Sequence, residues 1–152
     1  MIINKFAVIL EDISRFLSLD LKPDENNSCL LNIRNKIEIQ LELDPTEKYL
    51  VFGCIIGELP PGKFREEALV SGLKANAKPY PRLGTFAYSR LKNSLVLFEM
   101  IEIDVFSIEN ILSILTPFIK KAIKWKEAFD SGRTSPGIEE DYRHLSNDTN
   151  FF

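Results

Sequence analysis

Residues 57–84 read GELPPGKFREEALVSGLKANAKPYPRLG, and this stretch decides the order of the elements around it. Gly57 and the two prolines after it end an apolar strand, because glycine and proline interrupt strands. A helix is predicted from Lys63 to about Ala77, after which further prolines end it before a strand begins at Thr85. Gly72 lies inside this helix at a cost on the order of 1 kcal/mol relative to alanine, which indicates close packing there.

The N-terminal third of the chain changes from helical to strand periodicity. Apolar residues first recur at steps of three and four, which predicts an amphipathic helix that ends near Leu19. Two strands, Cys29–Ile33 and Ile37–Leu43, then form a predicted hairpin, and the second alternates strictly between apolar and polar residues. Tyr49–Ile56 is apolar on both faces, so this strand is expected at the centre of a sheet or against a partner.

The C-terminal part adds a second hairpin and a last helix. Thr85–Leu91 and Ser94–Ile101 are the predicted strands, and Ser107 is placed to cap the helix that follows. Pro117 lies inside this helical pattern, where it removes one backbone hydrogen bond and clashes with the preceding turn. We therefore expect a kink or a break in the helix at Pro117.

The sequence divides into a folded domain, residues 1–129, and an acidic tail, residues 130–152. The tail is rich in small polar residues, so it buries too little apolar surface to offset its ordering entropy, and disorder is predicted. It contains five acidic residues and two arginines, and their net charge of -3 equals that of the whole chain. The domain itself is therefore close to neutral.

Composition excludes several classes of protein. At 152 residues, with 45% hydrophobic and 27% charged residues, the chain is expected to form one globular domain. A pI near 5.3 and the absence of a basic stripe argue against nucleic acid as a partner. No apolar run is long enough to span a membrane, and two isolated cysteines suit a reducing compartment. A cytoplasmic location without membrane insertion is predicted.

Residues capable of catalysis do not cluster in the sequence. Cys29 and Cys54 occupy apolar strand positions without a nearby histidine, which is typical of buried thiols. His144, the single histidine, lies in the predicted tail, where nothing would position it for catalysis. Glu38 and Glu42 belong to the solvent-exposed face of one strand, which explains both charges without an acid–base role. We therefore expect no enzymatic activity, no metal and no cofactor.

Four motifs, taken in order, resemble one family. They are Leu59-Pro60 at a strand end, the helical segment Leu69–Asn76, Leu83-Gly84 before a strand, and Lys121–Trp125 in the last helix. Over residues 1 to 130 the chain resembles the class I chaperones of bacterial type III secretion. The resemblance implies an α+β fold in the order αβββαββα, a two-layer domain with a strongly twisted antiparallel sheet packed by helices, and a homodimer.

The same resemblance implies a function and its surfaces. It implies an ATP-independent cytoplasmic chaperone that binds the N-terminal chaperone-binding segment of one or more secreted effectors and keeps it soluble and secretion-competent. It also admits the secretion ATPase as a further partner. Client binding is assigned to Phe6, Ile9, Ile13, Leu31, Ile33, Ile37 and Ile39. The dimer interface is assigned to Leu69, Gly72, Leu73, Asn76, Phe86 and Tyr88.

Other interpretations of the same residues stay open at this point. The apolar face of the first helix is equally explained by packing on its own sheet, and Leu69 and Leu73 by packing in the core of one copy. A regulatory or scaffold dimer that binds a folded partner is the second candidate function. A small-ligand binder or enzyme is the third, because pockets can be built from scattered residues. The acidic tail and Pro117 depart from the family pattern.

Overall fold

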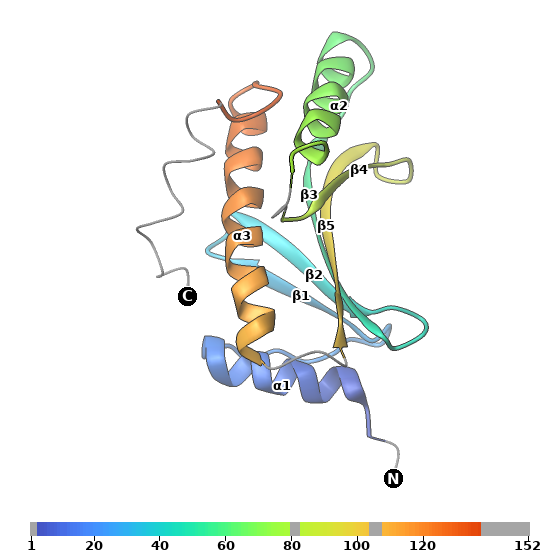
Figure 1. The fold of residues 1–152 in the computed structure, drawn as a ribbon, viewed down its shortest axis with the longest axis vertical. Helices are drawn as coiled ribbons and strands as arrows, with labels where there is room; N and C mark the ends of the chain where they lie inside the picture. Colours follow the sequence, from blue (N-terminus) through green and yellow to red (C-terminus); the bar gives the residue numbers. More distant parts are fainter. Residues whose placement is uncertain (1–2, 80–82, 104–107, 138–152) are drawn as a thin grey trace.

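The computed structural model describes residues 3–79, 83–103 and 108–137. Its elements follow the predicted αβββαββα order (Figure 1). They are α1 (Lys5–Leu17), β1 (Ser28–Ile33), β2 (Ile37–Leu43), β3 (Tyr49–Glu58), α2 (Lys63–Asn76), β4 (Thr85–Ser89), β5 (Ser94–Glu102) and α3 (Ile108–Asp130). Predicted residues Ser107 and His144 lie outside the described residues, as does the tail beyond Gly137.

The five strands form one antiparallel sheet in the order β1-β2-β3-β5-β4. β3 is the central strand, as its apolar faces predicted, and it pairs with β2 along one side and β5 along the other. A bulge between Ile55 and Gly57 shifts the register near the end of this strand. Such a bulge increases the local twist and re-aims the strand end toward the turn before α2.

The core lies on one face of the sheet. In Figure 1, α3 runs along the strands and α1 crosses at one end, while α2 lies beside β4 at the other end. The alternating residues of β2 are buried and exposed in turn, with Ile37, Ile39 and Leu41 on the covered face. Phe52 of β3 and Phe118 of α3 meet edge to face at 4.9 Å between ring centroids. The sheet and its helices therefore share one apolar layer.

Local capping sets the ends of α1. The side chain of Asn4 accepts a hydrogen bond from the backbone N–H of Ala7 at 3.2 Å and so satisfies one free donor of the first turn. Ser18 adopts a left-handed conformation with φ 54°, which ends the helix just before the predicted Leu19. Four apolar residues of α1, spaced at three and four residues, are buried: Phe6, Leu10, Ile13 and Leu17.

Pro117 does not break the last helix, which runs without interruption from Ile108 to Asp130. Of the two predicted outcomes, the break is therefore wrong, and the kink stays a prediction. Proline still removes one backbone hydrogen bond, but Leu115 and Phe118 beside it are fully buried on the sheet. Packing of this apolar face outweighs the local loss, because tertiary contacts supply most of the stability of helices in proteins.

The residues that follow α3 hydrogen-bond to its last turn. Gly132, at φ 82°, follows α3, and its backbone N–H donates to the carbonyl of Phe129 at 2.9 Å. Pro136 is buried. The chain therefore continues to pack on the domain for several residues after Asp130.

Phe118→Ala should lower the free energy of unfolding by about 4 kcal/mol, because it leaves a cavity beneath Phe52 in the core. Phe16→Ala is the matched control, since Phe16 lies on the exposed side of α1 and should change stability by less than about 1 kcal/mol. Urea unfolding followed by circular dichroism measures both values. Equal losses in the two variants would contradict this description of the core.

Candidate functional site

Asn76 joins α2 to the outer edge of the sheet. Its side-chain Nδ2 donates to the carbonyl oxygen of Phe86 at 2.9 Å, and its Oδ1 accepts from the Phe86 backbone N–H at 2.8 Å. An edge strand has unpaired backbone groups on its outer side, and the amide satisfies both groups of Phe86 as a neighbouring strand would. One turn earlier, a methyl group on Gly72 would lie only 3.3 Å from the Cβ of Phe86. Gly72 therefore permits the close approach that this pair of hydrogen bonds requires.

A second polar cluster holds the beginning of α2. The guanidinium of Arg65 donates through Nε to the carbonyl oxygen of Leu59 at 2.8 Å and through Nη2 to Oδ1 of Asn93 at 2.7 Å. The Tyr88 hydroxyl donates to the same oxygen of Asn93 at 2.7 Å. Hydrogen bonds to a charged donor are stronger than neutral ones, so this cluster ties α2 to the β4–β5 turn. Both ends of the helix are thus attached to the hairpin.

The predicted dimer residues divide into two groups in this structure. The following residues serve the contact between α2 and its own sheet or core: Leu69, Gly72, Asn76 and Phe86. Leu73 and Tyr88 instead face solvent, with exposed fractions of 68% and 40%. Val70, three residues before Leu73, is also exposed on α2 and was not among the predicted residues. The helical spacing of Val70 and Leu73 was the signal that could have found it.

The predicted client residues lie mostly in the core. Six of them are buried beneath the helices: Phe6, Ile13, Leu31, Ile33, Ile37 and Ile39. Ile9 is partly buried and packs against the same core. Their side chains belong to the common core of the domain, as the alternative assignment of the α1 face to the protein's own sheet had proposed. Apolar residues that do reach the surface of the same segments are Val8, Phe16, Leu19 and Leu30, and sequence reasoning did not select them.

The outer side of β1 is a free edge of the described sheet. β1 pairs with β2 alone in the strand order, so no described strand satisfies its outer backbone groups. Leu30 in the middle of β1 exposes 56% of its surface. An edge of this kind can accept an added strand, with backbone hydrogen bonds supplying affinity and neighbouring apolar side chains supplying selectivity.

The two thiols are buried, as the sequence indicated. Burial away from water raises the pKa of Cys54 to about 12 and also raises the pKa of Cys29. Both thiols therefore remain protonated at neutral pH, whereas nucleophilic attack and metal binding require the thiolate. Within the described residues, no three histidine, cysteine or carboxylate side chains gather as a metal site would require.

A shallow hollow of about 440 Å³ lies between the first turn of α2 and the segment that follows α3. Lys63, Phe64 and Glu67 line one side of it, and residues 132–135 line the other. It is open to solvent. Among the helices that the structure describes, none is long and apolar enough to cross a bilayer.

A model of the Tir chaperone protein (CesT) family matches residues 8–126, which is most of the chain. The chain belongs to this family, a family of chaperones rather than of enzymes. The resemblance found in the sequence is therefore confirmed. No curated protein sequence shows significant similarity to the chain.

Solved structures with the same fold share little sequence with this protein. One belongs to the HopA1–SchA chaperone–effector complex, at a TM-score of 0.65 and 14% identity, covering 84% of this chain and all (100%) of the other. The Yersinia pestis type III secretion chaperone SycH, solved with a stable fragment of YscM2, has a TM-score of 0.59 and 20% identity. The match covers 78% of this chain and 98% of the other. A chain of the ExsC–ExsE complex has a TM-score of 0.61 and 18% identity, and the match covers 81% of this chain and 92% of the other. These similarities confirm the predicted α+β fold.

Asn76→Ala should lower the free energy of unfolding by about 2 kcal/mol, because it leaves the backbone N–H and carbonyl of Phe86 without their partner. Asn110→Ala, at an exposed position of α3, removes the same amide group and should leave stability nearly unchanged. Chemical unfolding of the two variants measures their free energies of unfolding. A loss in Asn76→Ala no larger than in the control would show that the amide does not hold the β4 edge.

Proposed function

We propose that this protein is an ATP-independent cytoplasmic chaperone that binds the N-terminal chaperone-binding segment of one or more type III secretion effectors. It keeps that segment soluble and competent for export. Membership of the Tir chaperone protein family carries this proposal. Solved structures of the same fold come from complexes described as a chaperone–effector complex and as a type III secretion chaperone with a bound protein fragment, which supports it. Binding and release then depend on surfaces rather than on a chemical step.

The chaperone acts as a homodimer in this proposal, with the outer face of α2 at the interface. Val70 and Leu73 form an apolar strip there, and Tyr88 lies on the adjacent strand with part of its ring exposed. The hydrogen bonds of Asn76 and Arg65 hold α2 firmly to its own sheet. A rigid helix loses little conformational entropy on association, so a small apolar strip can support a symmetric contact.

The client segment binds along α1 and the free edge of β1. Phe16 exposes 63% of its surface on α1, and Leu30 is exposed on β1. The loop between these elements is tied to α1 by the Ser14 hydroxyl, which accepts from the Leu21 backbone N–H at 3.1 Å. An extended client can pair its backbone with β1 and place spaced apolar side chains against the exposed residues. The buried residues first predicted for this role support the surface from beneath.

A pull-down tests the proposed function directly. The tagged full chain is purified from lysate of its own bacterium, bound proteins are identified by mass spectrometry, and the mass of the complex is measured by light scattering. Recovery of a secreted protein, bound through a short N-terminal segment to a homodimer of this chain, supports the proposal. Recovery of folded cytoplasmic proteins alone would favour the scaffold function instead.

Leu73→Glu should raise the dimer dissociation constant at least about tenfold, because it buries a charge in the proposed interface. Leu91→Glu is the control, since Leu91 exposes 92% of its surface in the β4–β5 turn and is not part of the strip that Val70 and Leu73 form on α2. Sedimentation equilibrium measures the dimer dissociation constants of both variants. A Leu73→Glu protein that dimerises as tightly as the control would place the interface elsewhere.

Phe16→Glu should weaken binding of the recovered client segment about tenfold while leaving the dimer intact, because burial of an aromatic ring contributes about 1.5–3 kcal/mol. Leu91→Glu again serves as the control for an added surface charge. Isothermal titration calorimetry gives the affinities. Unchanged affinity in Phe16→Glu would move the client surface away from α1.

A further inference from the structure

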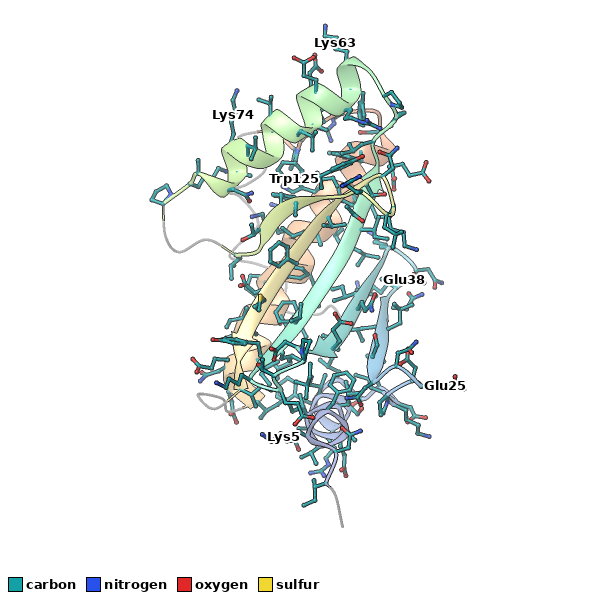
Figure 2. The ribbon with its side chains drawn as sticks, turned by 90° about the vertical axis from the view of Figure 1, so that its right-hand side faces the viewer. Lys5, Glu25, Glu38, Lys63, Lys74 and Trp125 are labelled. Atoms are coloured by element: carbon teal, nitrogen blue, oxygen red, sulfur yellow. The ribbon has the colours of Figure 1, made fainter. Side chains whose placement is uncertain are left out.

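The outer side of α3 carries two lysines one helical turn apart. Phe118, Ala122 and Trp125 are buried on the sheet side of this helix, and Figure 2 shows the helix behind the strands with Trp125 labelled. The helical repeat puts Lys120 and Lys124 on the opposite side, next to each other, because residues four apart are neighbours on a helix surface. These two residues are called the outer lysine pair below.

Lysine dominates the charge of α3 around the outer lysine pair. From residue 110 to residue 126 the helix contains four lysines and no aspartate or glutamate. The acidic residues that follow already have cationic partners, since Glu127 pairs with Lys36 at 3.3 Å and Asp130 pairs with Lys126 at 3.3 Å. A helix face of this composition attracts carboxylates from other parts of the molecule.

The chain turns back at the end of α3. Gly132 has a φ of 82°, and the backbone N–H groups of Gly132 and Arg133 donate to carbonyls of the last helical turns at 2.9 and 2.8 Å. These two bonds form the Schellman pattern, in which a left-handed glycine ends a helix and redirects the chain. Pro136 is buried, so the chain stays against the domain as far as Gly137, the last residue that the structure describes. In Figure 1 the last coloured residues lie to the left of the upper end of α3, with α2 on its right.

An acidic run begins two residues further on, because residues 139–141 are Glu-Glu-Asp. Four residues of extended chain after Gly137 span up to about 14 Å. Along the helix axis, Lys124 and Lys120 lie about 9 and about 15 Å before Asp130, since each helical residue adds about 1.5 Å. The acidic run is therefore long enough to reach the outer lysine pair while the described fold stays as it is.

We infer that the outer lysine pair of α3 is a docking site for the acidic run of this chain's own C-terminal tail, residues 139–141. Three carboxylates then face two ammonium groups at the protein surface. Each surface ion pair is weak by itself. The short tether gives the acidic run an effective concentration on the order of millimolar, so several weak pairs together hold it in place. Docking through charge buries little apolar surface, which agrees with the polar composition of the tail.

The docked tail controls access to this face of α3. It offsets the positive charge of the outer lysine pair, so an acidic segment of another protein must displace the tail before it can bind there. The contact uses none of the residues proposed for the dimer or for the client. It goes beyond the proposed function and does not depend on it.

Energy transfer within the full chain tests the docking. Trp125, the single tryptophan, is the donor and lies next to Lys124 in the sequence. Ser146→Cys provides the attachment point for a dansyl acceptor, since both native thiols are buried. Transfer efficiency should fall at least about twofold from low to high salt, because ions screen the charge pairs. Efficiency that does not change with salt, or that changes with protein concentration, overturns the inference.

Charge reversal then locates the contact. Lys120→Glu with Lys124→Glu should lower the transfer efficiency at low salt about twofold, because the acidic run is then repelled. Adding Glu139→Lys with Glu140→Lys to that variant should restore the efficiency, since the pairs form again with their signs exchanged. Efficiency that is unchanged by the first pair of substitutions, or not restored by the second, overturns the inference.

A matched control separates local contact from net charge. Lys5→Glu with Lys48→Glu makes the same change in net charge at exposed positions outside α3 and should leave the transfer efficiency unchanged. Equal losses in the control and in the α3 variant overturn the inference. If circular dichroism shows that the α3 variant does not fold, Glu139→Gln with Glu140→Gln removes charge from the tail instead and should also lower the efficiency. Wild-type efficiency in that tail variant likewise overturns the inference.

Discussion

The packing of α3 on one face of the sheet is the interaction on which the rest of the structure depends. Phe118 meets Phe52 of the central strand, and Trp125 lies against Phe86 of the edge strand with ring centroids 4.1 Å apart. One helix therefore spans the sheet from its centre to an edge. Because α3 and α1 occupy a single face, the strands keep their other face available, and the fold has a covered side and an open side.

Polar contacts at the β4 edge complement this apolar layer. An edge strand is a site where chains pair wrongly, and the side chain of Asn76 closes part of that edge with two hydrogen bonds. β1, at the opposite edge, pairs with no further described strand, and Asp24 bonds the backbone N–H and carbonyl of Ser28 at its beginning. The two edges thus differ in what they offer: β4 carries a fixed helix with an exposed apolar strip, and β1 has no described strand along its outer side. This asymmetry is what the proposed dimer and client surfaces use.

Periodicity was sufficient to predict the strands and helices but not to assign surface roles. The alternation of Ile37, Ile39 and Leu41 correctly identified one wet and one apolar face of β2. The same alternation cannot say whether an apolar face meets a helix, a partner or a client, since each of these removes the same surface from water. Residues such as Ile33 and Ile37 were therefore assigned to client binding, whereas their side chains are buried under the protein's own helices.

The sequence by itself determined the order of elements, the position of the turns and the central place of β3, because these depend on local spacing and on glycine and proline. It also pointed to the chaperone family through motifs in a fixed order. Tertiary structure alone decided that α3 continues through Pro117, that Asn76 and Gly72 serve the α2–β4 contact, and that Val70, Phe16 and Leu30 reach the surface. These outcomes depend on which residues distant in the chain come together, and burial against such neighbours outweighs local preference.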